Sequence, residues 1–278
     1  METTMKNEKI WFITGASKGF GRIWAEAALQ RGDKVVAAAR DQKALEELTT
    51  AYGDNVLPLA VNVTNQAIVG EAVQKAHEHF GRLDVVVNAA GYGCMGAIEE
   101  VSHEEIRANF DTNVFGTLNV IKAVIPYLRE QKSGHIFTVS SIGGIVSFPT
   151  GGIYTATKFA VEAFSEALAG ELAPFDINVT IIEPGSYATD FSTNTKRATS
   201  MPEYNHIRQA MAASFKPENT GDPKATAAVI LEVVDTEKPP LRLILGSMSL
   251  PVFKKVYEDR LNTWDEWSNV SNKAQKLG

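Results

Sequence analysis

The sequence is poor in cysteine, in clustered basic residues and in long apolar runs, and each absence excludes a class of protein. Cys94 is the only cysteine among 278 residues, so no internal disulfide can form and an oxidising compartment is not needed. The formal net charge of -6, without a cluster of lysine and arginine, argues against nucleic-acid binding. No apolar run approaches membrane-spanning length, and residues 1–9 lack the apolar core of a secretory signal. We therefore expect a cytoplasmic protein that binds neither nucleic acid nor membrane.

Strand and helix patterns alternate along most of the chain. Short apolar runs predict strands, and amphipathic segments between them predict helices. The repeated strand-helix units predict an α/β fold, a doubly wound parallel sheet with helices on both faces. We expect one domain over residues 9–278, preceded by a flexible segment at 1–8. The strands are expected at 10–13, 35–39, 56–63, 83–87, 134–139 and 177–182.

Three stretches carry special expectations. Ser102 and Glu105 form a capping box in front of a long helix, which Pro126 is expected to kink or end. Residues 186–219 show weak periodicity and form either a lid over the cleft or a disordered insert, and we favour the lid. A helical segment at about 251–270 is expected to pack on the core or on a subunit partner. The lid carries scattered large apolar side chains, namely Phe191, Met201, Tyr204, Met211 and Phe215.

A glycine-rich turn joins the first predicted strand to the first predicted helix and reads Thr14-Gly15-Ala16-Ser17-Lys18-Gly19-Phe20-Gly21. Helix amides at such a place point outward and glycines let a ligand approach, so the turn predicts a phosphate site rather than an ordinary tight turn. Arg40 ends the second strand where an NAD site has a carboxylate, and Lys18 lies in the turn. Asp41 is interpreted as a helix cap pointing away. Two cations favour a 2′-phosphate, hence NADP, and a solvated Arg40 is the alternative.

Tyr154 and Lys158 lie one turn apart on a predicted helix and can share a ligand. A free tyrosine has a pKa near ~10, and a lysine ammonium would stabilise its phenolate. The strand at 134–139 would deliver a hydroxyl to the same edge of the sheet. These groups suit general acid/base chemistry on a carbonyl, although an isolated pair of this kind is often only an exposed helix face.

In their order along the chain, these motifs resemble the short-chain dehydrogenases/reductases. Each motif alone is common, whereas the ordered set is specific to the family. The matching residues, from about Lys9 to Thr189, are the Thr-Gly-x-x-x-Gly-x-Gly turn, Asn88-Ala89-Ala90-Gly91, Asn113, Ser141, Tyr154-x-x-x-Lys158 and Pro184-Gly185.

The resemblance implies a Rossmann-type three-layer αβα sandwich with a seven-stranded parallel sheet and a nicotinamide cofactor along its carboxyl edge. Ser141, the serine nearer the tyrosine, would hydrogen-bond the substrate oxygen, and Tyr154 would exchange the hydroxyl proton. Lys158 would lower the pKa of Tyr154 and hold the nicotinamide ribose, and Asn113 would position a water. Asn62 stands where the family often has an aspartate near the adenine. The residues implied to border NADP(H) are Gly15, Ser17, Lys18, Gly19, Phe20, Gly21, Arg40, Asn62, Val63, Asn88, Ala89, Gly91, Tyr154, Lys158, Pro184, Gly185, Tyr187 and Thr189.

The other polar groups are interpreted as structural. His77 and His79 diverge on one helix, and no metal site is expected. Glu99-Glu100 and Glu104-Glu105 are interpreted as a solvated rim and a helix start rather than a catalytic pair. The segment Cys94-Met95 follows the fourth strand and either touches substrate or fills an apolar core.

The predicted function is that of an NADPH-dependent carbonyl reductase, reversible as an alcohol dehydrogenase. The alternative is a non-catalytic NADP-binding regulator, which has no need to keep all four catalytic groups. A sugar epimerase is disfavoured by the glycine spacing and by the lack of a large second domain. Phe148, Tyr187 and Phe191 indicate an apolar, bulky substrate such as a steroid, retinoid or aryl ketone, unless they serve packing. The resemblance also implies a homodimer or homotetramer.

Overall fold

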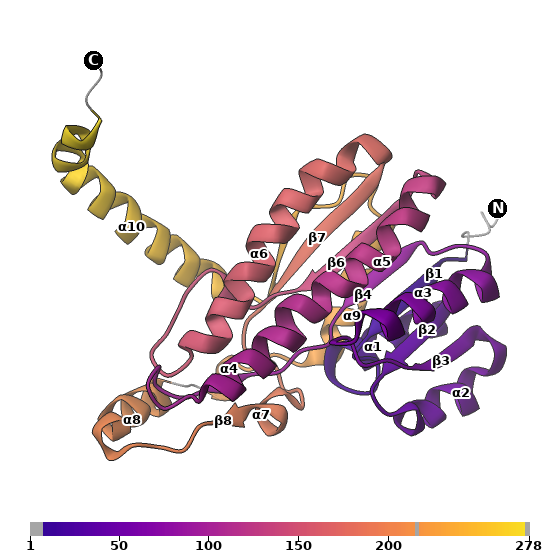
Figure 1. The fold of residues 1–278 in the computed structure, drawn as a ribbon, viewed down its shortest axis with the longest axis horizontal. Helices are drawn as coiled ribbons and strands as arrows, with labels where there is room; N and C mark the ends of the chain where they lie inside the picture. Colours follow the sequence, from indigo (N-terminus) through magenta and orange to yellow (C-terminus); the bar gives the residue numbers. More distant parts are fainter. Residues whose placement is uncertain (1–7, 215–216, 276–278) are drawn as a thin grey trace.

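A parallel sheet of seven strands forms the centre of the molecule (Figure 1). The computed structural model describes residues 8–214 and 217–275, so Phe215 and all but the last residue of the predicted flexible segment 1–8 lie outside the described residues. The strand order is β3-β2-β1-β4-β6-β7-β9, and it reverses direction between β1 and β4. The strands are β1 (Ile10–Thr14), β2 (Lys34–Ala39), β3 (Val56–Ala60), β4 (Val85–Asn88), β6 (Gly134–Val139), β7 (Ile177–Pro184) and β9 (Arg242–Leu245).

The predicted fold is confirmed, with one additional strand and with different ends for some of the expected strands. All six expected strands are present, and β9, which the sequence pattern did not locate, is the seventh. Strand β3 ends at Ala60 rather than at Val63. The side chain of Asn62 accepts hydrogen bonds from the amide and the hydroxyl of Thr64, at 3.2 and 3.0 Å, and this turn takes the chain out of the sheet.

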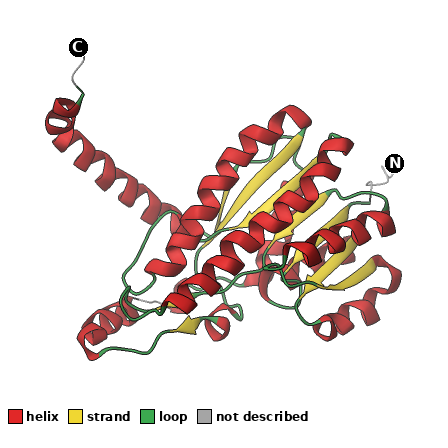
Figure 2. Cartoon of the chain, viewed as in Figure 1, coloured by secondary structure: helices red, strands yellow, loops and turns green. Residues whose placement is uncertain are grey.

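Helices cover both faces of the sheet, giving the expected three layers (Figure 2). Neighbouring residues of a strand point to opposite faces, so Phe12 of β1 packs under α3, α5 and α6, whereas Trp11 packs under α1, α2 and α9. The Trp24 indole of α1 donates to the Thr226 hydroxyl of α9 at 2.8 Å, which ties two covering helices together. These helices are α1 (Gly19–Arg31), α2 (Glu46–Tyr52), α3 (Gln66–Phe80), α5 (Gly116–Gln131), α6 (Gly152–Leu172) and α9 (Thr226–Asp235).

The long helix before β6 contains a wide turn. Helix α4 (His103–Phe110) passes through a π-helical stretch, Asp111–Phe115, directly into α5. The capping box is confirmed, since the Ser102 hydroxyl accepts from the Glu105 amide and the Glu105 carboxylate accepts from the Ser102 amide. Pro126 lies inside α5 and does not end it. The apolar face of α5 is buried on either side of Pro126, and that packing outweighs the lost backbone hydrogen bond.

The chain after β7 has more regular structure than its sequence pattern indicates. It contains α7 (Phe191–Asn194), β8 (Lys196–Arg197) and α8 (Asn205–Ser214), and β8 pairs in parallel with β5 (Cys94–Met95). This pairing attaches the predicted lid segment to the loop after β4.

Helix α10 (Ser249–Ser271) extends away from the rest of the molecule (Figure 1, yellow). Its first turns pack on the domain, where Phe253 is 5% exposed, but Trp264 and Trp267 are 63% and 61% exposed. The expected packing on the core is therefore correct for the first turns only. Across residues 8–214 and 217–275, no helix combines the length and the apolarity that a membrane crossing requires.

Candidate active site

A crevice of about 980 Å³ lies along the carboxyl edge of the sheet, at the reversal of strand order between β1 and β4. Almost all of the predicted site residues line it. Two do not: Asn88 and Asn113 are buried beside it, with 4% and 1% exposure. The lining residues from the prediction are Gly15, Ser17, Lys18, Gly19, Phe20, Gly21, Arg40, Asn62, Val63, Ala89, Gly91, Ser141, Tyr154, Lys158, Pro184, Gly185, Tyr187 and Thr189.

The glycine-rich turn requires its glycines because of close backbone contacts. Gly15 has a positive φ of 71°, and a Cβ there would come within 3.0 Å of the Ala89 backbone. A Cβ on Gly21 would lie 2.5 Å from the Gly15 carbonyl oxygen. No side chain caps the start of α1, so its first amides have no partner from the cap residue Lys18. A helix start of this kind, open to a crevice, fits the phosphates of a dinucleotide.

Thr14 joins the ends of β1 and β4 beneath the crevice. Its hydroxyl donates to the Val87 carbonyl at 3.3 Å and accepts from the amides of Ala89 and Ala90 at 3.2 and 3.3 Å. In the neighbouring Asn88, both polar side-chain atoms are buried without a hydrogen-bond partner. The predicted contact of Asn88 with the coenzyme therefore stays a prediction.

The end of β2 presents a cation and no carboxylate to the crevice. Arg40 is exposed and lines the crevice. The Asp41 side chain accepts from the Lys43 amide at 3.0 Å and so caps the following 3₁₀ turn, as predicted. The second predicted cation, Lys18, also lines the crevice, and its ammonium donates to the side chain of Asn194 in α7. Both predicted cations therefore lie at the crevice.

Tyr154 and Lys158 lie one turn apart on α6 and both line the crevice, with 5% and 7% exposure. The Lys158 ammonium is 5.9 Å from the centre of the Tyr154 ring and donates to the Val139 carbonyl at 2.8 Å. Ser141 lines the same crevice, and its hydroxyl accepts from the Gly143 amide at 3.0 Å. The three groups are therefore gathered at one place.

Burial dominates the acidity of both groups on α6. It raises the pKa of Tyr154 to about 12, while a hydrogen bond with Ser141 acts in the lowering direction. Burial also lowers the pKa of Lys158 to about 8, and the charge of Glu162 opposes this shift. The expected lowering of the Tyr154 pKa by Lys158 is not among these effects and stays a prediction. At neutral pH the phenol is protonated and can donate.

Asn113 lies in the π-helical stretch, and its side chain is committed to the loop after β4. Its amide oxygen accepts from the Tyr92 amide at 3.1 Å, and its amide nitrogen donates to the Tyr92 carbonyl at 3.0 Å and to Thr157 at 3.0 Å. Asn109, one turn earlier, also donates to the Tyr92 carbonyl. These bonds fix the loop that borders the crevice, and the predicted role of Asn113 in holding a water remains untested.

Several further residues line the crevice. Phe148 and Phe191 were noted in the sequence for their apolar character, and the Phe191 ring lies 5.3 Å from the Tyr154 ring. Met95 lines the crevice, whereas Cys94 is 2% exposed and belongs to the core. Tyr92, which the sequence analysis did not select, could have been identified because it directly follows the Asn88-Ala89-Ala90-Gly91 motif. The lining residues that the sequence did not single out include Tyr92, Asp111, Thr112, Asn194, Lys196 and Arg197.

Glu100 is not part of a solvated rim, and that interpretation is wrong. Its side chain is 1% exposed and accepts from the amides of Ala97 and Met201, at 2.7 and 2.6 Å, and from Arg208 at 2.7 Å. The backbone bond from Met201 is the largest of the contacts that lower the pKa of Glu100. Sequence reasoning missed this contact because its partners lie about 100 residues away, in the segment after β7.

Comparison with known proteins places the chain among described relatives. The family model for short chain dehydrogenase matches residues 9–200. The oxidoreductase BOA17 of Botryotinia fuckeliana is 40% identical over 268 residues, which cover 95% of this chain and 98% of that protein. The 3-ketodihydrosphingosine reductase of Bacteroides thetaiotaomicron is 37% identical over 252 residues, with 89% and 91% covered.

Solved structures show the same fold. A short-chain dehydrogenase from Streptomyces avermitilis superposes with a TM-score of 0.88 at 38% identity, covering 97% of this chain and 99% of that one. A Burkholderia phymatum protein in complex with NAD gives a TM-score of 0.81 at 26% identity, covering 92% and 95%. The crevice, its glycine turn and its tyrosine-lysine pair thus belong to a chain that is a member of the short-chain dehydrogenase/reductase family of oxidoreductases.

Proposed function

We propose that the protein is an NADPH-dependent carbonyl reductase, acting in reverse as an alcohol dehydrogenase. The observation that carries this proposal is the meeting of Ser141, Tyr154 and Lys158 in the crevice that begins at the glycine-rich turn. A bound nicotinamide supplies the hydride. The protein's part is to hold the carbonyl oxygen beside Ser141 and to give it the Tyr154 proton.

The acidity of Tyr154 supports reduction as the direction at neutral pH. With a pKa of about 12, the phenol carries its proton and can donate to an oxygen that gains negative charge. Lys158, still mostly charged below its pKa of about 8, would stabilise the phenolate left behind. Oxidation of an alcohol needs that phenolate at the start, so it would be favoured at higher pH.

Arg40 supports a preference for NADP over NAD. A guanidinium can hold a 2′-phosphate through paired, charge-assisted hydrogen bonds. The carboxylate of the following residue, Asp41, is engaged as a turn cap and is not offered to the ribose hydroxyls. We therefore propose NADP(H) as the coenzyme.

An apolar carbonyl or alcohol is the proposed substrate class. Met95, Ile142, Phe148 and Phe191 line the crevice, and the Phe191 ring lies 5.3 Å from the Tyr154 ring. Residues 186–219 are proposed to act as the substrate lid of a single catalytic domain. The relative that reduces 3-ketodihydrosphingosine is named for a ketone substrate, which agrees with this class. We also propose a cytoplasmic homodimer or homotetramer.

The test is NADPH oxidation by the purified protein with a panel of aromatic and aliphatic ketones. Replacing Tyr154 with Phe should lower kcat by about 10²–10⁴-fold, the usual contribution of a positioned acid. The affinity for NADPH should not change. Tyr127→Phe, on α5 and away from the crevice, is the matched control. NADP binding without turnover across the panel would favour the alternative, a non-catalytic regulator, and substantial turnover by Tyr154→Phe would refute the assigned acid.

A further inference from the structure

A buried carboxylate follows Lys158 by one turn on α6. Glu162 and Lys158 therefore lie on the same side of the helix, and Glu162 is 4% exposed. Burial raises the pKa of Glu162, while a hydrogen bond with Ser140 and the charges of Arg242 and Lys158 act in the lowering direction. Gly144 packs closely against Glu162. A Cβ added to Gly144 would lie 2.9 Å from a Glu162 oxygen and 2.4 Å from the Ser140 hydroxyl. A carboxylate buried this closely is costly unless a cation compensates it.

Glu162 shares one cation with a second buried carboxylate. The Arg242 guanidinium of β9 lies 3.3 Å from Glu162 and 3.5 Å from Glu183, which is 2% exposed. It also contacts Glu166 at 2.8 Å, but that side chain is 62% exposed. Burial and the charge of Glu162 raise the pKa of Glu183 to about 7, so its carboxyl is about half protonated near neutral pH.

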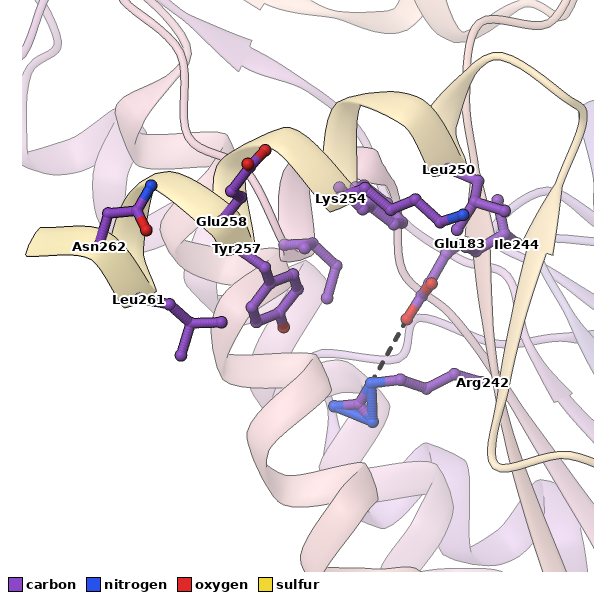
Figure 3. A pocket seen from close by; sticks show the side chains of 11 residues that line it. Glu183, Arg242, Ile244, Leu250, Lys254, Tyr257, Glu258, Leu261 and Asn262 are labelled. Atoms are coloured by element: carbon purple, nitrogen blue, oxygen red, sulfur yellow. Dashed lines mark ion pairs between the residues drawn. The ribbon is translucent and has the colours of Figure 1, made fainter. Parts of the chain in front are cut away.

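The cluster formed by Glu162, Glu183 and Arg242 borders a cavity on one side. A cavity of about 520 Å³ lies under α10 and is lined by Glu183 and Arg242, together with apolar residues such as Tyr257 and Leu261. Figure 3 shows the Glu183–Arg242 ion pair at the floor of this cavity, below the helix. Glu162 does not line it. Glu183 therefore meets this cavity, whereas Glu162 lies on the inner side of the cluster.

We propose that Glu162 is a positioning residue for the reaction, the counter-ion that keeps Lys158 protonated, with Arg242 keeping Glu162 itself ionised. This inference rests on the proposed reductase function. The other groups around Lys158 are the Tyr154 phenol on its own helix, the Val139 carbonyl of β6, and the neutral side chain of Asn113, which also lies beside Gly91. The charged groups around Glu162 are Lys158, Glu166, Glu183 and Arg242.

The physical reason is the balance of burial and charge at Lys158. Burial favours the neutral amine, and the Glu162 carboxylate is the charge that opposes it. Without Glu162, Lys158 would become neutral at a lower pH. A neutral amine cannot stabilise the Tyr154 phenolate that forms when the carbonyl oxygen takes its proton.

The test compares the pH dependence of kcat, with NADPH and a ketone substrate, in the wild type and in Glu162→Gln. The high-pH limb, where Lys158 loses its proton, should move to lower pH by about one unit or more in the variant. Glu162→Asp, which keeps the charge, should return the limb toward its original position. Glu166→Gln, the exposed partner of Arg242 one turn further along, is the matched control and should leave the limb in place. An unmoved limb in Glu162→Gln, or an equal loss of activity at every pH, would overturn the inference.

Two further measurements keep the test decisive. Should Glu162→Gln fail to fold, Arg242→Met removes the cation that keeps Glu162 ionised and should move the limb in the same direction, and an unmoved limb there also refutes the inference. The second measurement needs no turnover. An NMR titration of the Lys158 side chain, assigned by the loss of its signal in Lys158→Met, reports the Lys158 pKa, which should fall in Glu162→Gln. A wild type that turns over no ketone would refute the proposed function, whereas an unchanged Lys158 titration would refute the role of Glu162.

Discussion

The two walls of the crevice are held in place in different ways. On the β1–β4 side, contacts to the backbone hold the wall in place. The Gly15 backbone lies against that of Ala89, and the Thr14 hydroxyl joins the ends of two strands. On the side formed after β7, side chains from distant parts of the sequence do it, chiefly Glu100, which holds Arg208 and the backbone of the same segment. The first wall, which we call the backbone wall, is thus part of the sheet. The second, the attached wall, is held to the sheet by a few polar contacts. The first wall suits a coenzyme common to many enzymes, and the second suits a substrate that differs among them.

The largest effect should come from the backbone wall, in Gly21→Ala. The added Cβ would lie 2.5 Å from the Gly15 carbonyl, so the turn must move and NADPH affinity should fall by about 100-fold or more. Gly170 of α6 is the matched control, since a Cβ there meets nothing within 4 Å. Gly170→Ala should leave affinity unchanged and stabilise the protein by about 0.5–1 kcal/mol. Titration of NADPH fluorescence and thermal unfolding measure both, and equal affinities for the two variants would contradict the distinction.

An intermediate effect is expected at the edge of the backbone wall. Arg40→Ala should lower kcat/KM with NADPH by about 10–100-fold and change kcat/KM with NADH little, because only NADPH carries the 2′-phosphate. Lys43→Ala, whose ammonium lies on the exposed turn that follows, serves as the control for a general loss of positive charge. A parallel loss with both coenzymes would show that Arg40 has no part in the discrimination.

Loosening the attached wall should weaken substrate binding more than coenzyme binding. Glu100→Gln removes the charge that holds Arg208 and the Met201 amide, so KM for the ketone should rise by about 10-fold while the NADPH Kd stays the same. Glu104→Gln, an exposed acid at the start of α4, is the control. An increase in the NADPH Kd of similar size would show that the two walls are not independent.

Acid should loosen the same wall. The folded structure lowers the pKa of Glu100 below its ordinary value of 4.5, so its contribution is complete above that value and is lost as the pH falls through the lowered one. Limited proteolysis within residues 186–214 should therefore accelerate at acid pH in the wild type. In Glu100→Gln it should be fast at all pH values, and a protease-resistant variant would contradict this.

The smallest effect is expected on the outer part of α10, which extends away from the rest of the molecule. Trp264→Ala should change the free energy of unfolding by less than about 0.5 kcal/mol in the isolated chain, because its ring is 63% exposed. Phe253→Ala, at 5% exposure, should cost about 3–5 kcal/mol. Denaturant unfolding at low protein concentration measures both. A large cost for Trp264→Ala would show that the outer part of the helix is covered in solution.

The backbone wall could be predicted from the sequence, and the attached wall could not. The turn from Thr14 to Gly21, the Asn88 motif and the Tyr154–Lys158 pair depend on short spacings and on parallel strands that end at one edge, which are local properties of the chain. Glu100 depends on partners about 100 residues away, so its neighbours in sequence gave no signal. For the same reason the sequence did not reveal that Glu162 and Glu183 share Arg242, or that β8 pairs with β5.

The place of Thr14 has a consequence for how the protein responds to its coenzyme. Thr14 ends β1, which lies between β2 and β4 in the sheet, so the glycine-rich turn cannot open locally without disrupting β1 and β4. Ligand bound there should raise the cost of opening the whole sheet and slow hydrogen exchange at the most protected amides, such as those of Phe12 and Val86. A bound coenzyme would then stabilise the entire fold, whereas a bound substrate would stabilise only the segment after β7.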